Sequence, residues 1–212
     1  FATDGTTSFY KGKAVRSVDI SDPAALREIG FVPMKGYPQD LAVSGNILFC
    51  VDGLRLISID VSNPARMKVI SETVVAQAPE YGPQGIAIDG NTAYLACRRA
   101  GVLAFDISAP AKPELILAVK TSFSRGVAVH KNRDHTFVFS ADDTKGIAVI
   151  EDGKIVNEYP VTDGSAARIR IADGKAYAAC GSSLLKIFLI SPDGKLTQFA
   201  KYDSIPCGGY FG

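Results

Sequence analysis

The stretch from Gly82 to Pro110, GPQGIAIDGNTAYLACRRAGVLAFDISAP, determines the expected fold. Gly85–Asp89, Thr92–Cys97 and Gly101–Ile107 are short runs with alternating character and many β-branched or aromatic residues, which is typical of β-strands. The pairs Asp-Gly and Gly-Asn favour tight turns between them. With Glu114–Lys120 as a fourth strand, this stretch predicts a small antiparallel sheet.

The same pattern recurs along the chain. SVDISDP, SIDVSNP and AFDISAP end at Pro23, Pro64 and Pro110. The residue directly ahead of each first strand, here called the pre-strand position, recurs at a nearly constant spacing. The pre-strand positions are Gln39, Gln84, Arg125, Ala167 and Gly208. Four short strands repeated at this spacing predict a β-propeller of four-stranded antiparallel blades. A β-sandwich, the alternative fold, does not require a regular repeat.

Two of the repeats resemble the LVIVD repeat family: GYPQDLAVSGNILFCVDGLRLISIDVSNP, from Gly36 to Pro64, and the stretch quoted first, extended to Tyr81. The resemblance weakens in repeats 123–160 and 165–202, where the Asp-Ile-Ser-x-Pro ending is lost. It implies a β-propeller, often in secreted or cell-surface proteins, and no particular activity, since one fold hosts many functions. We therefore expect an extracellular, periplasmic or cell-surface location.

The two ends of the chain suggest how a ring of blades closes. Phe1–Asp4 matches the second strand of a repeat, Gly12–Ile20 the third and Ala25–Val32 the fourth, whereas the C-terminal PCGGYFG matches the start of a first strand. We therefore expect the C-terminus to supply the inner strand of the N-terminal blade. This arrangement makes residues 1–212 a single domain of five blades, because closure removes exposed sheet edges. A longer parent chain with more blades is the alternative.

Composition excludes several partners. A hydrophobic content of 47% with 21% charged residues is typical of a globular protein. The net charge of +1 creates no global field for nucleic acid or an anionic membrane surface. No apolar run approaches the roughly 18 residues that span a bilayer. We expect no nucleic-acid partner and no membrane insertion.

Arginines mark a candidate ligand site. In a propeller, the loops ahead of the first strands and after the second strands share one face around the central channel. Arg168-Ile169-Arg170 replaces the usual Gly-Ile-Ala of the first strand in the last full repeat. Because arginine suits bidentate carboxylate or phosphate recognition, these residues with Arg125 and Arg98 predict a site for a small anionic or polar ligand. The alternative is a structural Arg–Asp network, since a buried cation requires a partner.

Aromatic residues precede three of the pre-strand positions, where they either stack on a ligand or pack the junctions between blades. The complete set of predicted ligand-binding residues is Tyr37, Gln39, Tyr81, Gln84, Arg98, Phe123, Arg125, Arg168 and Arg170.

Catalytic chemistry has less support in the sequence. His130 and His135 lie around the turn after a first strand, on the face opposite this site, which disfavours a Ser–His–Asp or histidine-rich metal centre there. An acid–base enzyme would have to use Asp4, Asp52, Asp142 or a tyrosine. We therefore predict a non-enzymatic binding or scaffold module, without cofactor or metal, for a protein partner or a small ligand. A hydrolase or lyase is the alternative, and no catalytic residue is assigned.

The four cysteines lack C-x-x-C spacing. Cys50 is expected in the core, whereas Cys97 and Cys180 occupy equivalent repeat positions and Cys207 lies on the same predicted face. A Cys180–Cys207 disulfide, a soft-metal site and inert buried thiols all remain open.

Overall fold

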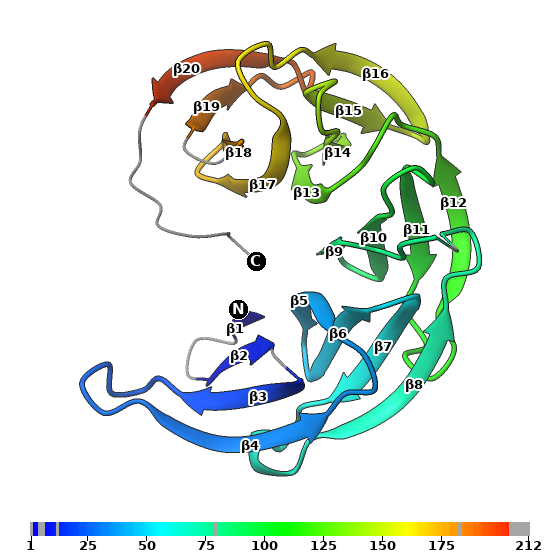
Figure 1. Cartoon of the computed structure of the whole chain (residues 1–212), viewed down its shortest axis with the longest axis vertical. Coiled ribbons are helices and arrows are strands. Elements are labelled where there is room, and N and C mark those ends of the chain that lie inside the picture. The colour runs from blue at the N-terminus through cyan, green and yellow to red at the C-terminus, as the bar shows by residue number, and fades with distance from the viewer. Residues whose placement is uncertain (1, 4–6, 12, 79, 182–183, 204–212) are drawn as a thin grey trace. The chain divides into compact units, whose positions relative to one another are not determined.

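The computed structural model describes residues 2–3, 7–11, 13–78, 80–181 and 184–203 (Figure 1). These residues form twenty β-strands in five four-stranded antiparallel sheets, and each sheet runs in sequence order. The one helix among these described residues is η1 (Pro64–Arg66), a 3₁₀ helix of three residues. No helix in this part of the chain is long and apolar enough to cross a membrane. The expectation of an all-β chain of repeated four-stranded sheets is therefore confirmed.

The strand bounds follow the sequence repeat. The first sheet contains β1 (Ala2–Thr3), β2 (Thr7–Lys11), β3 (Ala14–Asp19) and β4 (Arg27–Pro33). The second contains β5 (Pro38–Ser44), β6 (Ile47–Asp52), β7 (Arg55–Asp60) and β8 (Lys68–Val74). The third contains β9 (Gly85–Asp89), β10 (Thr92–Ala96), β11 (Val102–Asp106) and β12 (Glu114–Val119). The fourth contains β13 (Gly126–Lys131), β14 (Thr136–Ala141), β15 (Ile147–Glu151) and β16 (Lys154–Tyr159). The fifth contains β17 (Ala166–Ala172), β18 (Lys175–Cys180), β19 (Leu184–Ile190) and β20 (Leu196–Tyr202).

The N-terminal sheet corrects one prediction. Ala2–Thr3 is the first strand and pairs with Thr7–Lys11, which is the second, so the assignment of Phe1–Asp4 as the second strand is wrong. A two-residue strand is too short to show alternation, which is why the sequence pattern missed it. The sheet obtains four strands from residues 2–33. The C-terminal segment that was expected to complete it, from residue 204 onward, lies outside the described residues.

The chain divides into two compact units, and each is described here by itself. The first comprises residues 1–93 and 105–114, and the second comprises residues 94–104 and 115–212. In the first unit, β5 contacts both β2 and β9, so the second sheet is packed on both sides. Nearly all of β6 is therefore buried, whereas the outer strand β8 is largely exposed. Burial on both faces explains why the middle strands are apolar at consecutive positions.

The Asp-Ile-Ser-x-Pro motif shapes the connection between the third and fourth strands. In two of its copies, Asp60 Oδ1 accepts a hydrogen bond from Ser62 N–H (2.9 Å) and Asp106 Oδ1 accepts one from Ser108 N–H (2.8 Å). These bonds fix a turn, as short acidic side chains commonly do. The recurring aspartate is therefore architectural.

The proline of the motif packs against the preceding sheet. The Ser17 hydroxyl donates to the Pro64 carbonyl (2.7 Å), and the Ser71 hydroxyl donates in the same way to the Pro110 carbonyl (2.7 Å). A methyl group added to Gly30 would lie 2.3 Å from the Pro64 carbonyl oxygen, so the two sheets approach closely there. The motif thus fills the space between consecutive sheets.

Candidate functional site

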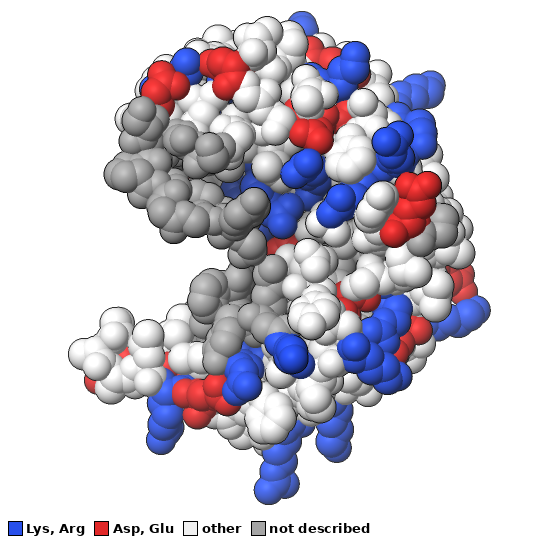
Figure 2. All heavy atoms as spheres, in the orientation of Figure 1, with Lys and Arg blue, Asp and Glu red and all other residues white. Residues whose placement is uncertain are grey.

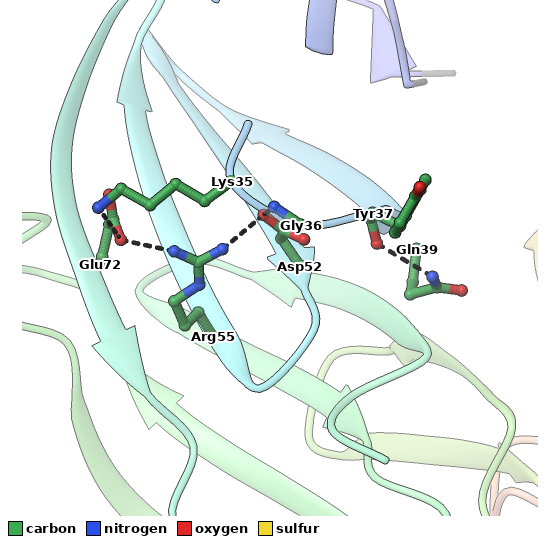
Figure 3. Close-up of polar contacts among 7 residues, drawn as sticks. All are labelled: Lys35, Gly36, Tyr37, Gln39, Asp52, Arg55 and Glu72. Carbon is green, nitrogen blue, oxygen red and sulfur yellow. Dashed lines mark hydrogen bonds and ion pairs between the residues drawn. The ribbon is translucent and has the colours of Figure 1, made fainter. Parts of the chain in front are cut away.

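Asp52, at the end of β6, anchors a chain of alternating charges in the first compact unit (Figure 3). Its buried Oδ2 accepts hydrogen bonds from Gly36 N–H (3.0 Å) and the Arg55 guanidinium (2.9 Å). Arg55 also binds Glu72 (2.7 Å), which is paired with Lys35 (2.9 Å). Lys35, and then Arg55, lower the pKa of Glu72. This network fastens the segment before β5 to β7 and β8.

Gly36 is required by the position of the Asp52 carboxylate. A methyl group added to Gly36 would lie 2.1 Å from Asp52 Oδ1 and 2.9 Å from its Cγ. That oxygen is buried and accepts no hydrogen bond. The carboxylate therefore packs directly against the glycine.

The first compact unit holds four of the predicted ligand-binding residues. Tyr37 and Tyr81 are 66% and 56% exposed, so they contribute little to the core. Gln39 Nε2 donates a hydrogen bond to the Tyr37 carbonyl (3.0 Å), while Gln84 is half-buried. Asp40 Oδ2 accepts from Ile86 N–H (3.2 Å), which ties the start of β5 to β9. The segments that carry Gln39 and Gln84 are therefore neighbours.

The second compact unit contains a group of cations around one aromatic ring. The guanidinium carbons of Arg98, Arg99 and Arg125 lie 5.7, 5.9 and 5.6 Å from the centre of the Phe123 ring. These separations are within the range of cation–π attraction. We call these four residues the arginine cluster. Arg125 Nη2 is 3.2 Å from Asp143 Oδ2, which provides a carboxylate for one of the three cations.

Asp142 holds the aromatic centre of the cluster in place. It is 2% exposed, and its carboxylate accepts hydrogen bonds from the Thr121 hydroxyl (2.8 Å), from Ser122 N–H (2.8 Å) and from Phe123 N–H. A carboxylate that accepts several such bonds fixes the conformation of the segment that donates them. Phe123 is therefore positioned by a rigid backbone.

Two residues of the site occupy a backbone conformation that favours glycine. The four residues at one equivalent repeat position, directly after Asp52, Cys97, Asp142 and Cys180, have φ values of +58° at Gly53, +49° at Arg98, +51° at Asp143 and +65° at Gly181. A non-glycine residue in this region costs roughly 1–2 kcal/mol. Such strain is concentrated at functional sites. The replacement of glycine at these two repeat positions was a sequence signal of the site that the initial predictions did not use.

Arg168, on β17, extends the cluster, and its Nη1 donates to the Arg125 carbonyl (2.8 Å). Arg170 is exposed, and its Nη1 donates to the Ile169 carbonyl (3.2 Å). The described contacts of these arginines therefore include main-chain carbonyl groups, and the Arg–Asp pairing anticipated by the structural alternative occurs at Arg125. Figure 2 shows Lys and Arg side chains gathered over β13 and β17.

Five predicted ligand-binding residues thus belong to the second compact unit, where the arginine cluster unites three of them with Arg99. The five are Arg98, Phe123, Arg125, Arg168 and Arg170. Arg99 was missing from the prediction, because the repeat pattern drew attention to positions that neighbour the strands and Arg99 lies one residue further into the loop.

The histidines lie at the far end of β13 from Arg125, and the described cysteines are buried. His130 and His135 line a cavity of about 530 Å³ at the other end of β13, where His135 Nδ1 contacts Glu151. Cys50, Cys97 and Cys180 are buried and form no disulfide among the described residues, and burial raises the pKa of Cys97 to about 12. Cys207 lies outside the described residues. Within the described ranges, no three His, Cys, Asp or Glu side chains gather to hold a metal ion.

Comparisons with known proteins agree with the architecture. Five consecutive four-stranded antiparallel sheets define an all-β repeat protein, consistent with a propeller. The profile of the LVIVD repeat matches residues 35–73 and 83–121. These two stretches of the chain are therefore LVIVD repeats, which are associated with β-propeller folds.

The similarity to solved structures concerns the fold. A functionally unknown protein from Desulfotomaculum acetoxidans DSM 771 is similar with a TM-score of 0.75 and 13% sequence identity, over 93% of this chain and 67% of that chain. No curated protein matches the chain in sequence.

Proposed function

We propose that this protein is a non-enzymatic binding module of the β-propeller type, with the five sheets as its blades. The arginine cluster is its recognition site, and the ligand is a molecule that presents a carboxylate or phosphate group. The first sheet has four strands without the C-terminal segment, so the proposal does not require that segment as an inner strand. A location outside the cytoplasm, expected from the family resemblance, is part of the same proposal.

The convergence of Arg98, Arg99 and Arg125 on Phe123 is the observation that supports this function. Three guanidinium groups around one ring repel one another, and the Asp143 carboxylate pairs with Arg125. An anion placed among them would relieve this repulsion further, and guanidinium groups bind carboxylate and phosphate with two parallel hydrogen bonds. The strained backbone at Arg98 and Asp143 is consistent with a site built for binding.

The carboxylates of the alternative enzymatic hypothesis have other partners. Asp52 binds a main-chain N–H group and Arg55, and Asp142 binds two main-chain N–H groups and a hydroxyl. These contacts explain both residues as structural anchors. Anion binding is therefore the better supported function.

Titration with defined anions tests the proposal. Calorimetry with inorganic phosphate, citrate and glucuronate, with glucose as the neutral control, should detect saturable binding of at least one anion. Arg99→Gln and Arg125→Gln should each weaken that binding about tenfold, the effect of losing one charge-assisted contact. Arg66→Gln, at an exposed arginine of η1, is the matched control and should bind normally. Equal affinity in all the variants, or no binding of any anion, would contradict the assignment.

A further inference from the structure

A second and chemically different cavity lies within the second compact unit. It has a volume of about 190 Å³ and lies among residues of β10, β11, β12, β14 and β15. Most of its wall is apolar and buried, and these wall residues are Val102, Ala104, Val119, Val138 and Ile150. Leu117 and Asp152 are the exposed residues of its lining, so they mark its opening.

The cavity occurs where a connecting loop is short. The connections between the third and fourth strands span seven residues in the first three sheets, from the end of β3, β7 or β11 to the start of β4, β8 or β12. Between β15 and β16 the connection is Asp152-Gly153 alone. This turn lacks the Asp-Ile-Ser-x-Pro loop whose proline carbonyl accepts a hydrogen bond from the preceding sheet elsewhere. Most of the loop that fills this space at the earlier junctions is therefore missing.

The residues that face the Asp152-Gly153 turn show that it takes the place of the longer proline loop of the earlier sheets. Gly30 pairs with Ser17 across β3 and β4, and Ser71 pairs with Ser58 across β7 and β8. Gly30 contacts the Pro64 carbonyl and Ser71 contacts the Pro110 carbonyl, in each case the proline carbonyl of the next loop. Leu117 follows Ala104 at the same sequence separation as in these two pairs, so it occupies the equivalent place. It packs against Gly153, since a methyl group added to that glycine would lie 2.9 Å from Leu117 Cδ1. The larger side chain replaces part of the missing loop and leaves the cavity beside it.

We propose that this cavity binds a small, neutral aromatic molecule. Interiors pack closely, and an apolar cavity of roughly 150 Å³ is known to remain dry and to accept benzene. The present volume admits a single or fused ring of that class, and the apolar wall disfavours a charged group. Tyr94, Thr136 and Asp152 contribute polar groups to the lining, so a ring with one hydrogen-bond donor, such as indole or phenol, fits the site better than a plain hydrocarbon.

Methyl-resolved NMR titration of the whole chain tests this inference. Benzene and indole are the probes, and inositol is the polar control of similar ring size. Indole should give saturable shifts confined to methyl groups of the lining, among them those of Val102, Leu117 and Val138, and it should raise the melting temperature. Shifts that do not saturate, or that spread over exposed apolar strands, would overturn the proposal.

Variants separate the cavity from the apolar surface. Ala104→Leu should fill the space and weaken indole binding at least tenfold, and Val138→Ile is a milder replacement if the first variant does not fold. Ile116→Ala removes a 58% exposed apolar side chain from the same strand as Leu117 and should leave binding unchanged. Loss of binding in Ile116→Ala, or normal binding in Ala104→Leu, would refute the site. Arg99→Gln should bind indole normally, so the anion site and this cavity can fail independently.

Discussion

Replacing Gly36 with alanine adds a single methyl group, but it should destabilise the first compact unit by far more than such a small change would at an open position. The new methyl group would lie 2.1 Å from Asp52 Oδ1, inside any allowed contact, so the carboxylate has to move by about 1 Å. Asp52 is fully buried and cannot turn toward solvent. The movement lengthens its bonds to Gly36 N–H and to Arg55, now 3.0 and 2.9 Å.

The expected cost follows from those two bonds. A hydrogen bond to a charged group contributes about 1.5–3 kcal/mol, and both are weakened rather than lost. Steric strain from an added methyl group in a packed region adds about 1 kcal/mol. We therefore expect Gly36→Ala to lower the free energy of unfolding by about 3 kcal/mol. With a urea m-value of about 2 kcal/mol/M, the midpoint of this unit should fall by about 1.5 M.

A double-mutant cycle with Asp52→Ala isolates the contact. Asp52→Ala is itself destabilising, but it removes the atoms that the new methyl group meets, so Gly36→Ala should cost almost nothing in that background. Urea unfolding followed by far-ultraviolet circular dichroism is a suitable assay, because the chain contains no tryptophan. A loss below about 1 kcal/mol in the wild-type background, or equal losses in both, would refute the steric explanation.

Three further outcomes are expected. Arg98→Gly should raise the free energy of unfolding, measured in urea, by roughly 0.5–1 kcal/mol, because glycine adopts the positive φ of this position without strain. The same variant should weaken anion binding in calorimetry, and unchanged binding would argue against a role of Arg98 in recognition. Burial raises the pKa of Cys97 to about 12, so this thiol should resist thiol reagents at about pH 8 until urea unfolds the chain. Peptide mass mapping measures the labelling, and rapid labelling of Cys97 in the native chain would contradict its burial. Hydrogen bonds from Lys186 and, to a smaller extent, Lys201 hold the pKa of Asp163 below its ordinary value of 3.8. The ionised Asp163 carboxylate therefore stabilises the folded chain fully above pH 3.8, and this stabilisation is lost as the pH falls further. Asp163→Asn should therefore be less stable at neutral pH, since buried Lys186 loses its counter-charge, and should show a shallower acid dependence in urea titrations; identical pH profiles would contradict this pairing.

Several elements of the fold could be predicted from local sequence patterns. Gly85–Asp89 is the predicted strand to the residue, because Asp-Gly and Gly-Asn turns mark strand ends by their own backbone preferences. The turns at the motif aspartates Asp60 and Asp106 are local in the same way, because each accepts a hydrogen bond from the serine N–H group two residues further along. The N-terminal strands failed because a two-residue strand carries no period.

The candidate site was only partly predictable. The repeat led to Arg98, Phe123 and Arg125 as candidate site residues, but it contains no information on how the two segments that carry them converge. Arg99 joins the cluster because the backbone at Arg98 has a positive φ and pairs with Ser124, a contact between segments that are distant in the sequence. Such an approach depends on the packing of neighbouring sheets.

The sequence by itself determined the repeat, the strands and the identity of the departures from the repeat, because turn chemistry and alternation act between near neighbours. The tertiary structure alone decided what those departures do. It gathered three arginines around Phe123, buried Asp52 against Gly36, and left a cavity beside the short turn at Asp152-Gly153. These outcomes depend on distances between residues far apart in the chain, which are set by the packing of consecutive sheets rather than by any local preference.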